Sequence, residues 1–310
     1  MLLAFDVRLI GRDVRVAWGV NNSTNPTLEN YVIVVMGATG NVGRTLVQEL
    51  VAAGEKVTAV SRGVSAGHTV DGVRYERADL AVPESLRPAL DGATALFLLV
   101  SGAGAHLSPR DILDVATASG VTRTVLLSSQ AAGTRPESPS HAPLRVLENV
   151  VRESGTDWTI LRPGGFASNT YAWAESVRLH RTVAAPFGDV ALPIVDPDDI
   201  AAVAAACLRD ADHAGRTYVL TGPELSTPRQ RAEAIGAVLD EPVRFIEQSR
   251  DEARGLMLGF MPEPVVEGTL AILGDPTPQE RRVSPDIELV LGRAPRTFAD
   301  WIERHVAAFR

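Results

Sequence analysis

The feature that most constrains this chain is a glycine-rich turn placed directly after a continuous apolar run. Residues 32–36 read Val-Ile-Val-Val-Met, without a polar side chain, which is typical of a strand buried on both faces of a parallel sheet. The next seven residues, 37–43, contain three glycines, and apolar residues at helical spacing follow to residue 53. A strand, a glycine-rich turn and an amphipathic helix in this order predict the phosphate-binding turn of a dinucleotide-binding fold.

Each glycine of this turn has a separate predicted role. The first permits the tight turn, the second lets the backbone approach a pyrophosphate, and the third lets the helix pack closely on the strand. The free N–H groups at the helix N-terminus attract the phosphates. The residues predicted to bind the cofactor here are Gly37, Thr39, Gly40, Asn41, Val42 and Gly43. The alternative is a glycine-rich turn that binds no ligand.

The end of the second predicted strand, residues 56–60, favours NADP(H) over NAD(H). NAD-specific sites usually carry an acidic residue here to bind the ribose 2′-hydroxyl, whereas NADP sites carry an arginine nearby. Ser61 and Arg62 supply a hydroxyl and a cation, and no carboxylate stands at this strand end. The alternative for Arg62 is an ordinary solvated surface arginine.

The ends of the third and fourth predicted strands add further cofactor residues. Asp79 and Leu80 follow strand 73–76, where a short acidic side chain can meet the adenine amino group. Asp79 capping its own turn is the alternative. Val100 and Ser101 end strand 93–100 and are predicted to border the cofactor, because ligands bind at the carboxyl ends of parallel strands.

The chain from residue 31 onward alternates strands and helices. Further strands are predicted at 124–127, 158–161 and 218–220, and helices at 111–118, 144–153, 198–208, from 228 and from 298. Thr297 and Asp300 form a predicted capping pair for the last of these helices. This alternation predicts an α/β fold with a Rossmann-like, doubly wound parallel sheet.

Composition narrows the setting of the protein. A net charge of −8 over 310 residues argues against a general nucleic-acid surface, which needs clustered positive charge. The single cysteine, Cys207, excludes an intramolecular disulfide and a Cys-rich metal site, and it suits the reducing cytoplasm in which we expect this protein. No apolar run reaches the roughly 18–20 residues of a membrane span. Residues 1–30 read as an N-terminal extension, either a small hairpin or a loose leader.

Several motifs, taken in chain order, resemble the NmrA-like atypical short-chain dehydrogenase/reductase family. After the glycine turn these motifs are Ala78-Asp79-Leu80, Ser128-Ser129, residues 154–164, residues 196–201, residues 219–223 and residues 298–301. The resemblance covers about residues 32–310. It implies a Rossmann fold, a nicotinamide cofactor, here NADP(H), and a small C-terminal substrate-binding subdomain. It fixes the fold more closely than the function, because its members include reductases and NADP-sensing regulators.

The resemblance also suggests domain boundaries and further site residues. The Rossmann core is expected at 31–165, completed by about 190–222, and the subdomain at 166–189 and 223–310. Ser128, Pro163, Gly164 and Phe166 are expected to border the nicotinamide part of the cofactor. Ser129, after the fifth strand, is a candidate donor to a substrate oxygen, and a turn hydroxyl that bonds the backbone is its alternative.

One departure from the wider superfamily is informative. Many members use a Tyr-x-x-x-Lys pair, in which tyrosine protonates the carbonyl oxygen and lysine lowers its pKa. The matching segment here, residues 140–145, reads Ser-His-Ala-Pro-Leu-Arg and contains neither residue. The only lysine, Lys56, begins the second strand, and none of the four tyrosines has a lysine four residues later. A Tyr–Lys mechanism is therefore excluded.

Other polar and apolar side chains remain as site candidates. Tyr171 is the leading side-chain acid, with His141 as a further candidate and Arg145 as a candidate anchor for a substrate anion. A solvated loop histidine and a helix-surface arginine are the alternatives for the last two. The predicted substrate contacts are Ser129, Phe166, Asn169, Met257 and Phe260, the last two from an apolar segment that either covers the substrate or belongs to the subdomain core.

The favoured function is an NADPH-dependent reductase of a quinone-like or polyaromatic ketone substrate. Without a Tyr–Lys pair, hydride transfer is easiest when the substrate stabilises its own reduced anion, because a phenol is far more acidic than a simple alcohol. An NADP(H)-sensing regulator without catalysis is the main alternative. A sugar-nucleotide epimerase or dehydratase fits less well, since those enzymes use the missing pair.

Overall fold

The computed structural model describes residues 31–63, 69–100, 104 and 106–310. The predicted N-terminal extension, residues 1–30, and the predicted cofactor residue Ser101 lie outside the described residues. Within the described ranges, no helix is long and apolar enough to cross a bilayer.

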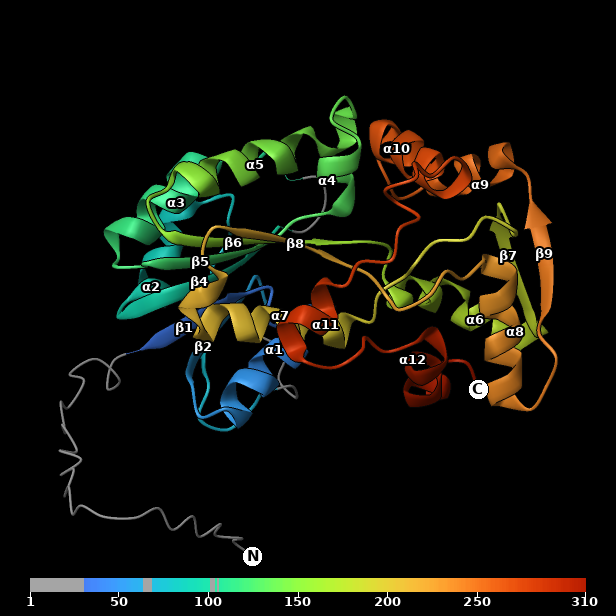
Figure 1. Ribbon diagram of the computed structural model, residues 1–310, viewed down its shortest axis with the longest axis horizontal. Helices are drawn as coiled ribbons and strands as arrows, with labels where there is room; N and C mark the ends of the chain where they lie inside the picture. Colours follow the sequence, from blue (N-terminus) through green and yellow to red (C-terminus); the bar gives the residue numbers. More distant parts are fainter. Residues whose placement is uncertain (1–30, 64–68, 101–103, 105) are drawn as a thin grey trace, which may run out of the picture.

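Seven parallel strands form the central sheet in the order β3-β2-β1-β4-β5-β6-β8 (Figure 1). These strands are β1 (Val32–Met36), β2 (Lys56–Ser61), β3 (Arg74–Arg77), β4 (Ala93–Leu99), β5 (Arg123–Leu127), β6 (Asp157–Pro163) and β8 (Arg216–Leu220). The order reverses between β1 and β4, and the ligand crevice of such sheets lies at this reversal, outside the carboxyl ends of the strands. The predicted Rossmann-like sheet is confirmed.

Helices cover both faces of this sheet (Figure 1). One face carries α1 (Asn41–Ala52), α7 (Pro197–Arg209) and α11 (Asp286–Leu291), and the other carries η1 (Pro83–Leu86), α2 (Arg87–Leu90), α3 (Pro109–Ala118) and α5 (Ala142–Glu153). Successive side chains of a strand point to opposite faces, so Phe97 of β4 belongs to the first core layer and Leu96 to the second. Both side chains are almost fully buried.

Shorter helices connect these layers near the strand ends. They are α4 (Gln130–Thr134), η2 (Pro139–His141) and η4 (Ala211–His213). The first two lie between β5 and α5, in the segment where the sequence places the missing Tyr–Lys pair.

The second part of the chain builds on a small parallel sheet of two strands, β7 (Thr182–Pro186) and β9 (Arg244–Gln248). Around it lie η3 (Ala167–Trp173), α6 (Ala174–His180), α8 (Pro228–Leu239), α9 (Arg250–Met257), α10 (Glu263–Gly274), α12 (Phe298–His305) and η5 (Val306–Ala308). Trp301, 1% exposed, lies in the apolar cluster that α6, α8 and α12 share. The predicted capping pair is present, since Thr297 Oγ1 accepts from the Asp300 N–H at 3.0 Å.

Helix α11 belongs to the core although it lies within the range expected for the subdomain, residues 223–310. Ile287 is fully buried in the core layer that contains α1 and α7. Asp286 accepts a hydrogen bond of 2.7 Å from the backbone N–H of Val219 in β8. The chain therefore returns to the core before α12. In the core, α11 buries the apolar side chain of Ile287 and accepts a hydrogen bond from the backbone N–H of Val219 in the last strand.

Gly43 marks a very close backbone approach, which gives a stability test. A Cβ at this position would lie 2.2 Å from the carbonyl oxygen of Gly37. We expect Gly43→Ala to lower the free energy of unfolding by about 1–3 kcal/mol, the usual cost of overpacking. Urea unfolding followed by circular dichroism measures this change.

The matched control is Gly255→Ala in α9. A Cβ there meets no atom within 4 Å. Because alanine favours helix over glycine, this variant should be as stable as the parent or slightly more stable. Equal unfolding midpoints for Gly43→Ala and the parent protein would contradict the close contact.

Candidate functional site

The glycine turn after β1 has the conformation that a phosphate-binding turn needs. Gly37 adopts a φ of +68°, in the left-handed region that favours glycine. The Gly40 N–H donates to the Gly37 carbonyl at 2.9 Å, and Gly40 then begins α1 as a cap residue without a side-chain hydrogen bond. The first N–H groups of α1 therefore stay available to an anion in front of the helix.

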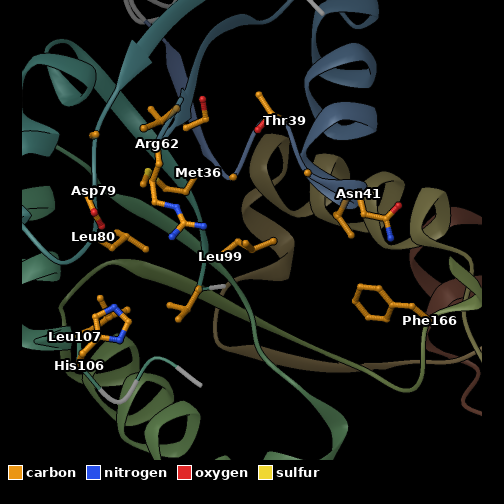
Figure 2. A pocket seen from close by; sticks show the side chains of 17 residues that line it. Met36, Thr39, Asn41, Arg62, Asp79, Leu80, Leu99, His106, Leu107 and Phe166 are labelled. Atoms are coloured by element: carbon orange, nitrogen blue, oxygen red, sulfur yellow. The ribbon is translucent and has the colours of Figure 1, made fainter. Parts of the chain in front are cut away.

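A cavity of about 380 Å³ opens at this turn, at the carboxyl ends of β1, β2 and β4 (Figure 2). The predicted cofactor residues in its lining are Gly37, Thr39, Gly40, Asn41, Val42, Ser61, Arg62, Asp79, Leu80, Val100 and Phe166. The lining extends from Asp79 after β3 to Phe166 after β6, with the N-terminus of α1 between them. These residues fit an extended dinucleotide whose phosphates face α1.

The end of the cavity near β2 and β3 carries the groups that select the cofactor. Figure 2 shows the Arg62 side chain directed into the cavity, opposite Asp79 and Leu80. Ser61 donates from its hydroxyl to the Gly63 carbonyl at 2.8 Å and keeps its oxygen as an acceptor. Asp79 caps its turn by accepting from the Ala81 N–H at 3.0 Å, and it also lines the cavity.

The sequence does not predict six residues of this lining. They are Met36, Val60, Ala78, Leu99, His106 and Leu107. Met36, Val60 and Leu99 stand at or next to the carboxyl ends of their strands, so strand position alone is a usable signal for them. His106 and Leu107 precede α3, and the spacing of that segment gives no comparable signal.

Four predicted cofactor residues do not line the cavity. Gly43 packs α1 against the turn, which is the role predicted for the third glycine. Pro163 ends β6, and the Gly164 N–H donates to the Leu220 carbonyl of β8 at 2.9 Å. Ser128 is buried, and its hydroxyl contacts α5 and not the cavity.

A buried ion cluster accounts for Ser128. Its Oγ donates to Glu148 Oε1 at 2.6 Å, and Arg162 and Arg152 pair with the same carboxylate at 2.6 and 3.0 Å. Burial by itself raises the pKa of Glu148, but the hydrogen bonds from Arg162 and Ser128 outweigh it and lower this pKa. Ser128 therefore fixes α5 to the end of β5 and has no contact with the cavity.

Among the described residues, Phe166, three residues after the end of β6, lines the other end of the cavity. Asn41 of the phosphate turn donates from Nδ2 to Ser168 Oγ in η3, just beyond Phe166. Gln130 is 8% exposed, and its Nε2 donates to the Gln279 carbonyl at 3.2 Å. Phe166 therefore borders the end where a nicotinamide ring is expected, and Ser168 and Gln130 lie outside the lining.

Ser129 caps α4 directly after β5 and does not line the cavity. Its Oγ accepts from the Ala131 N–H at 3.3 Å, so the backbone contact considered as an alternative is present. Because the hydroxyl acts there as an acceptor, its own proton stays free to be donated. Both roles of Ser129 are compatible in this geometry.

The structure does not bring Tyr171 to the cavity. Its ring packs on Trp301, His305 and Phe309 at centroid distances of 5.0, 5.9 and 6.0 Å. Burial, and then the charges of Asp198 and Asp196, raise its pKa. A phenol in this position is a weaker acid than a free tyrosine and lies among the side chains of the C-terminal helix.

The remaining predicted substrate residues also lie outside the cavity lining. Asn169 is exposed, and its N–H donates to the Phe166 carbonyl at 3.1 Å. Met257 packs on the small cluster of Ala253, Val266 and Leu270 between α9 and α10, and Phe260 is 72% exposed. Met257 thus has the core position considered as the alternative, because α10 covers the apolar face of α9.

The segment that matches the Tyr–Lys pair is engaged with its own loop. His141 Nδ1 lies 2.9 Å from Ser140 Oγ, and burial together with the Arg145 charge lowers the pKa of His141. Arg145 donates to the carbonyls of Arg135 and Ser138 at 3.2 and 3.0 Å. Arg145 therefore orders the loop between α4 and α5 through backbone contacts.

Comparison with known proteins identifies the family. Residues 37–211, more than half of the chain, match the model of a family described as NAD(P)H-binding. The chain belongs to this NAD(P)H-binding family. The nicotinamide cofactor expected from the sequence is thereby confirmed.

Two relatives that the chain covers almost completely are named as reductases. It is 36% identical over 292 residues to (4-alkanoyl-5-oxo-2,5-dihydrofuran-3-yl)methyl phosphate reductase of Streptomyces griseus, covering 90% of this chain and 99% of that protein. It is 30% identical over 285 residues to NAD(P)H azoreductase of Xenophilus azovorans, with 90% and 99% covered. The fold is also that of the Escherichia coli NADPH-dependent quinone oxidoreductase QOR2, solved with NADPH, with a TM-score of 0.75 at 22% identity over 88% of this chain and 99% of that one. The chain is an oxidoreductase.

Arg62 gives a test of cofactor choice. We expect the protein to bind NADPH more tightly than NADH, and Arg62→Ala to weaken NADPH binding about tenfold or more, because arginine–phosphate hydrogen bonds are charge-assisted. NADH affinity should change less than about twofold. Fluorescence titration gives both dissociation constants.

Arg110→Ala is the control for this test. Arg110 is an exposed arginine of α3 that lies 3.9 Å from Glu153 and outside the cavity. It should leave both dissociation constants unchanged. Equal affinity of the parent protein for NADH and NADPH would contradict the role of Arg62.

Proposed function

We propose that this protein is an NADPH-dependent reductase that transfers hydride to a quinone-like or polyaromatic ketone acceptor without a Tyr–Lys pair. The observation that carries the proposal is the cavity lining, which in the described part of the chain contains neither a tyrosine nor a lysine. Lys56 begins β2, at the edge of the sheet opposite the cavity, so it is too far away to assist an acid there.

The side chains at the nicotinamide end support a mechanism without a strong acid. Ser129 offers one hydroxyl proton, but giving it to an alkoxide would leave a serine alkoxide in its place, so the negative charge would only be moved. Tyr171 packs on the C-terminal helix, and His141 is tied to Ser140 with a lowered pKa. The acceptor itself therefore has to accommodate the negative charge that hydride addition creates.

NADPH, when bound, supplies the hydride. The protein's contribution is orientation, since Phe166 forms one wall and the Asn41–Ser168 hydrogen bond holds the phosphate turn against η3. In this proposal, Ser129 and the backbone groups after β5 and β6 donate hydrogen bonds to the oxygen that gains charge. This machinery suffices when the reduced product is a phenolate or a similarly delocalised anion.

The relatives support the same chemical class of acceptor. The names of the three compared enzymes specify an azo group, a quinone, and a dihydrofuranone that carries an alkanoyl group. Each is a conjugated, electron-poor system whose added electron pair is delocalised onto nitrogen or oxygen. A conjugated acceptor is therefore the class that we propose for this chain as well.

Substitution of the candidate acids tests this mechanism. Ser129→Ala and Tyr171→Phe should each lower turnover by no more than about 10²-fold, the weak end of general acid catalysis. Turnover is measured by stopped-flow oxidation of NADPH with a quinone as acceptor. Its pH dependence should follow the ionisation of the reduced substrate and not that of a protein group near neutrality.

An acceptor series supplies the matched control. An aromatic ketone with a neighbouring free phenol should be reduced well, whereas its O-methylated analogue or an isolated ketone should be a very poor acceptor. The proposal fails if Tyr171→Phe loses more than about 10⁴-fold in turnover while the parent enzyme reduces isolated ketones well. Tight NADPH binding without reduction of any acceptor would favour the NADP(H)-sensing alternative.

A further inference from the structure

Among the charged side chains of the described residues, five are buried, and four of these five have counterions. Each of the four is a carboxylate that contacts at least one arginine: Glu148 with Arg162, Asp196 with Arg304, Asp199 with Arg296, and Glu280 with Arg135. The fifth is Arg231 in α8, which forms no ion pair with any described residue. Arg231 is thus the one buried charged residue, among those described, that lacks a counterion.

A buried cation without a counterion is unfavourable for the fold. Arg231 is only 8% exposed, and burial lowers its pKa to about 10, with no carboxylate opposing that shift. At neutral pH the guanidinium still carries its charge. Removing a charged group from water without pairing it costs free energy, so such a residue is expected where a ligand supplies the missing anion.

The hydrogen bonds of Arg231 leave its outer end free. Nε donates to the Thr227 carbonyl at 3.2 Å, and neither terminal nitrogen has an acceptor among the described residues. Among the described residues, three polar side-chain atoms are inaccessible to solvent and have no hydrogen-bond partner: Arg123 Nε, Thr124 Oγ1 and Ser226 Oγ. The terminal nitrogens of Arg231 do not belong to this group, so they are accessible from outside the protein. Together they form the planar fork that binds carboxylates and phosphates in a bidentate manner.

Arg231 does not itself line the cofactor cavity, but two chain segments join its surroundings to the cavity wall. Its guanidinium lies over the Trp173 ring, 5.8 Å from the centroid. Trp173 ends η3, and η3 begins directly after Phe166, which lines the cavity. Helices α6 and α8 lie in the same part of the molecule (Figure 1) and both contribute to one apolar cluster.

A second chain segment leads to the same place. Ser226, next to the Thr227 that holds Arg231, pairs with Leu192, and Val195, three residues after Leu192, pairs with Phe166. Two chain segments therefore connect Phe166 at the cavity wall with the surroundings of Arg231. One is η3, which ends at Trp173, and the other is the segment 192–195, which pairs with Ser226 next to Thr227.

We propose that Arg231 binds an anionic group of the hydride acceptor, a phosphate ester or a carboxylate, and thereby selects charged acceptors over neutral ones. The proposal rests on the proposed function, because it concerns the substrate of the same reductase site. The Trp173 ring supports the guanidinium from one side, and the two terminal nitrogens meet the anion. Arg231 is a specificity residue in this scheme and takes no part in hydride transfer.

The test uses two acceptors with the same redox ring, a quinone with a hydroxyalkyl chain and the phosphate monoester of that quinone. Arg231→Met removes the charge and keeps an apolar side chain of similar length. It should raise KM for the phosphate ester by roughly 10- to 100-fold, the effect of losing charge-assisted hydrogen bonds. The kinetic constants for the neutral quinone and kcat for both should stay within about twofold of the parent values.

Two further variants sharpen the comparison. Arg231→Lys keeps the charge without the fork and should raise KM for the ester by an intermediate factor. Arg229→Met is the control on the same helix. Arg229 is an exposed arginine that forms an ion pair with Asp189 at 2.9 Å. It should leave the preference for the ester unchanged.

Thermal unfolding separates this role from a structural one. If Arg231 serves the ligand, Arg231→Met removes an unpaired buried charge, and its Tm should equal or exceed that of the parent protein. A structural arginine predicts a lower Tm and an equal loss with both quinones, and this result would overturn the proposal. Unchanged KM values for the ester would overturn it too.

Failure of the proposed function is distinguishable from failure of the anion site. Should the parent protein oxidise NADPH with neither quinone, the proposed function is wrong, and calorimetric titration of the NADP-loaded protein with the phosphate ester then decides about Arg231. Binding by the parent protein that Arg231→Met weakens about tenfold or more supports the site. Equal binding by both proteins, or none, refutes it.

Discussion

The architecture depends on one backbone contact, the approach of Gly43 at the start of α1 to the carbonyl of Gly37. A Cβ at residue 43 would lie 2.2 Å from that oxygen, so only glycine permits the helix to begin this close to the end of β1. The short distance directs the N-terminal N–H groups of α1 at the carboxyl ends of the central strands. The cavity opens there because the strand order reverses between β1 and β4.

Buried carboxylates join the second part of the chain to this core. Asp199 of α7 accepts hydrogen bonds from Arg293 and Arg296 of the C-terminal segment, and Glu280 pairs with Arg135 beside α4. Loss of one partner in such a pair leaves a buried charge unpaired, which is strongly destabilising, although the intact pair contributes little net stability. These contacts fix where the subdomain stands relative to the nicotinamide end of the cavity.

The pairing of buried charges also separates the residues that support the fold from those that are available to a substrate. Ser128 after β5 and Arg162 near the end of β6 both contact the buried Glu148, so they hold α5 in place and lie outside the cavity lining. The cavity lining in the described ranges offers walls and hydrogen-bond donors but no tyrosine or lysine acid. This lining is the basis for proposing acceptors that stabilise their own reduced form, and Arg231 is the residue that we propose to choose among them.

The sequence by itself determined the seven strands of the central sheet, the phosphate turn, most of the cavity residues near it and the capping pair of α12, because these depend on local spacing and because parallel strands end at a common edge. It did not predict β7 and β9, the two strands of the small sheet. Only the tertiary structure decided that Tyr171 packs on Trp301, more than a hundred residues later, and that Met257 lies under α10. It also decided that Arg231 has no counterion among the described residues. Such contacts join side chains far apart in the chain, and their geometry depends on how whole helices pack, which no local pattern records.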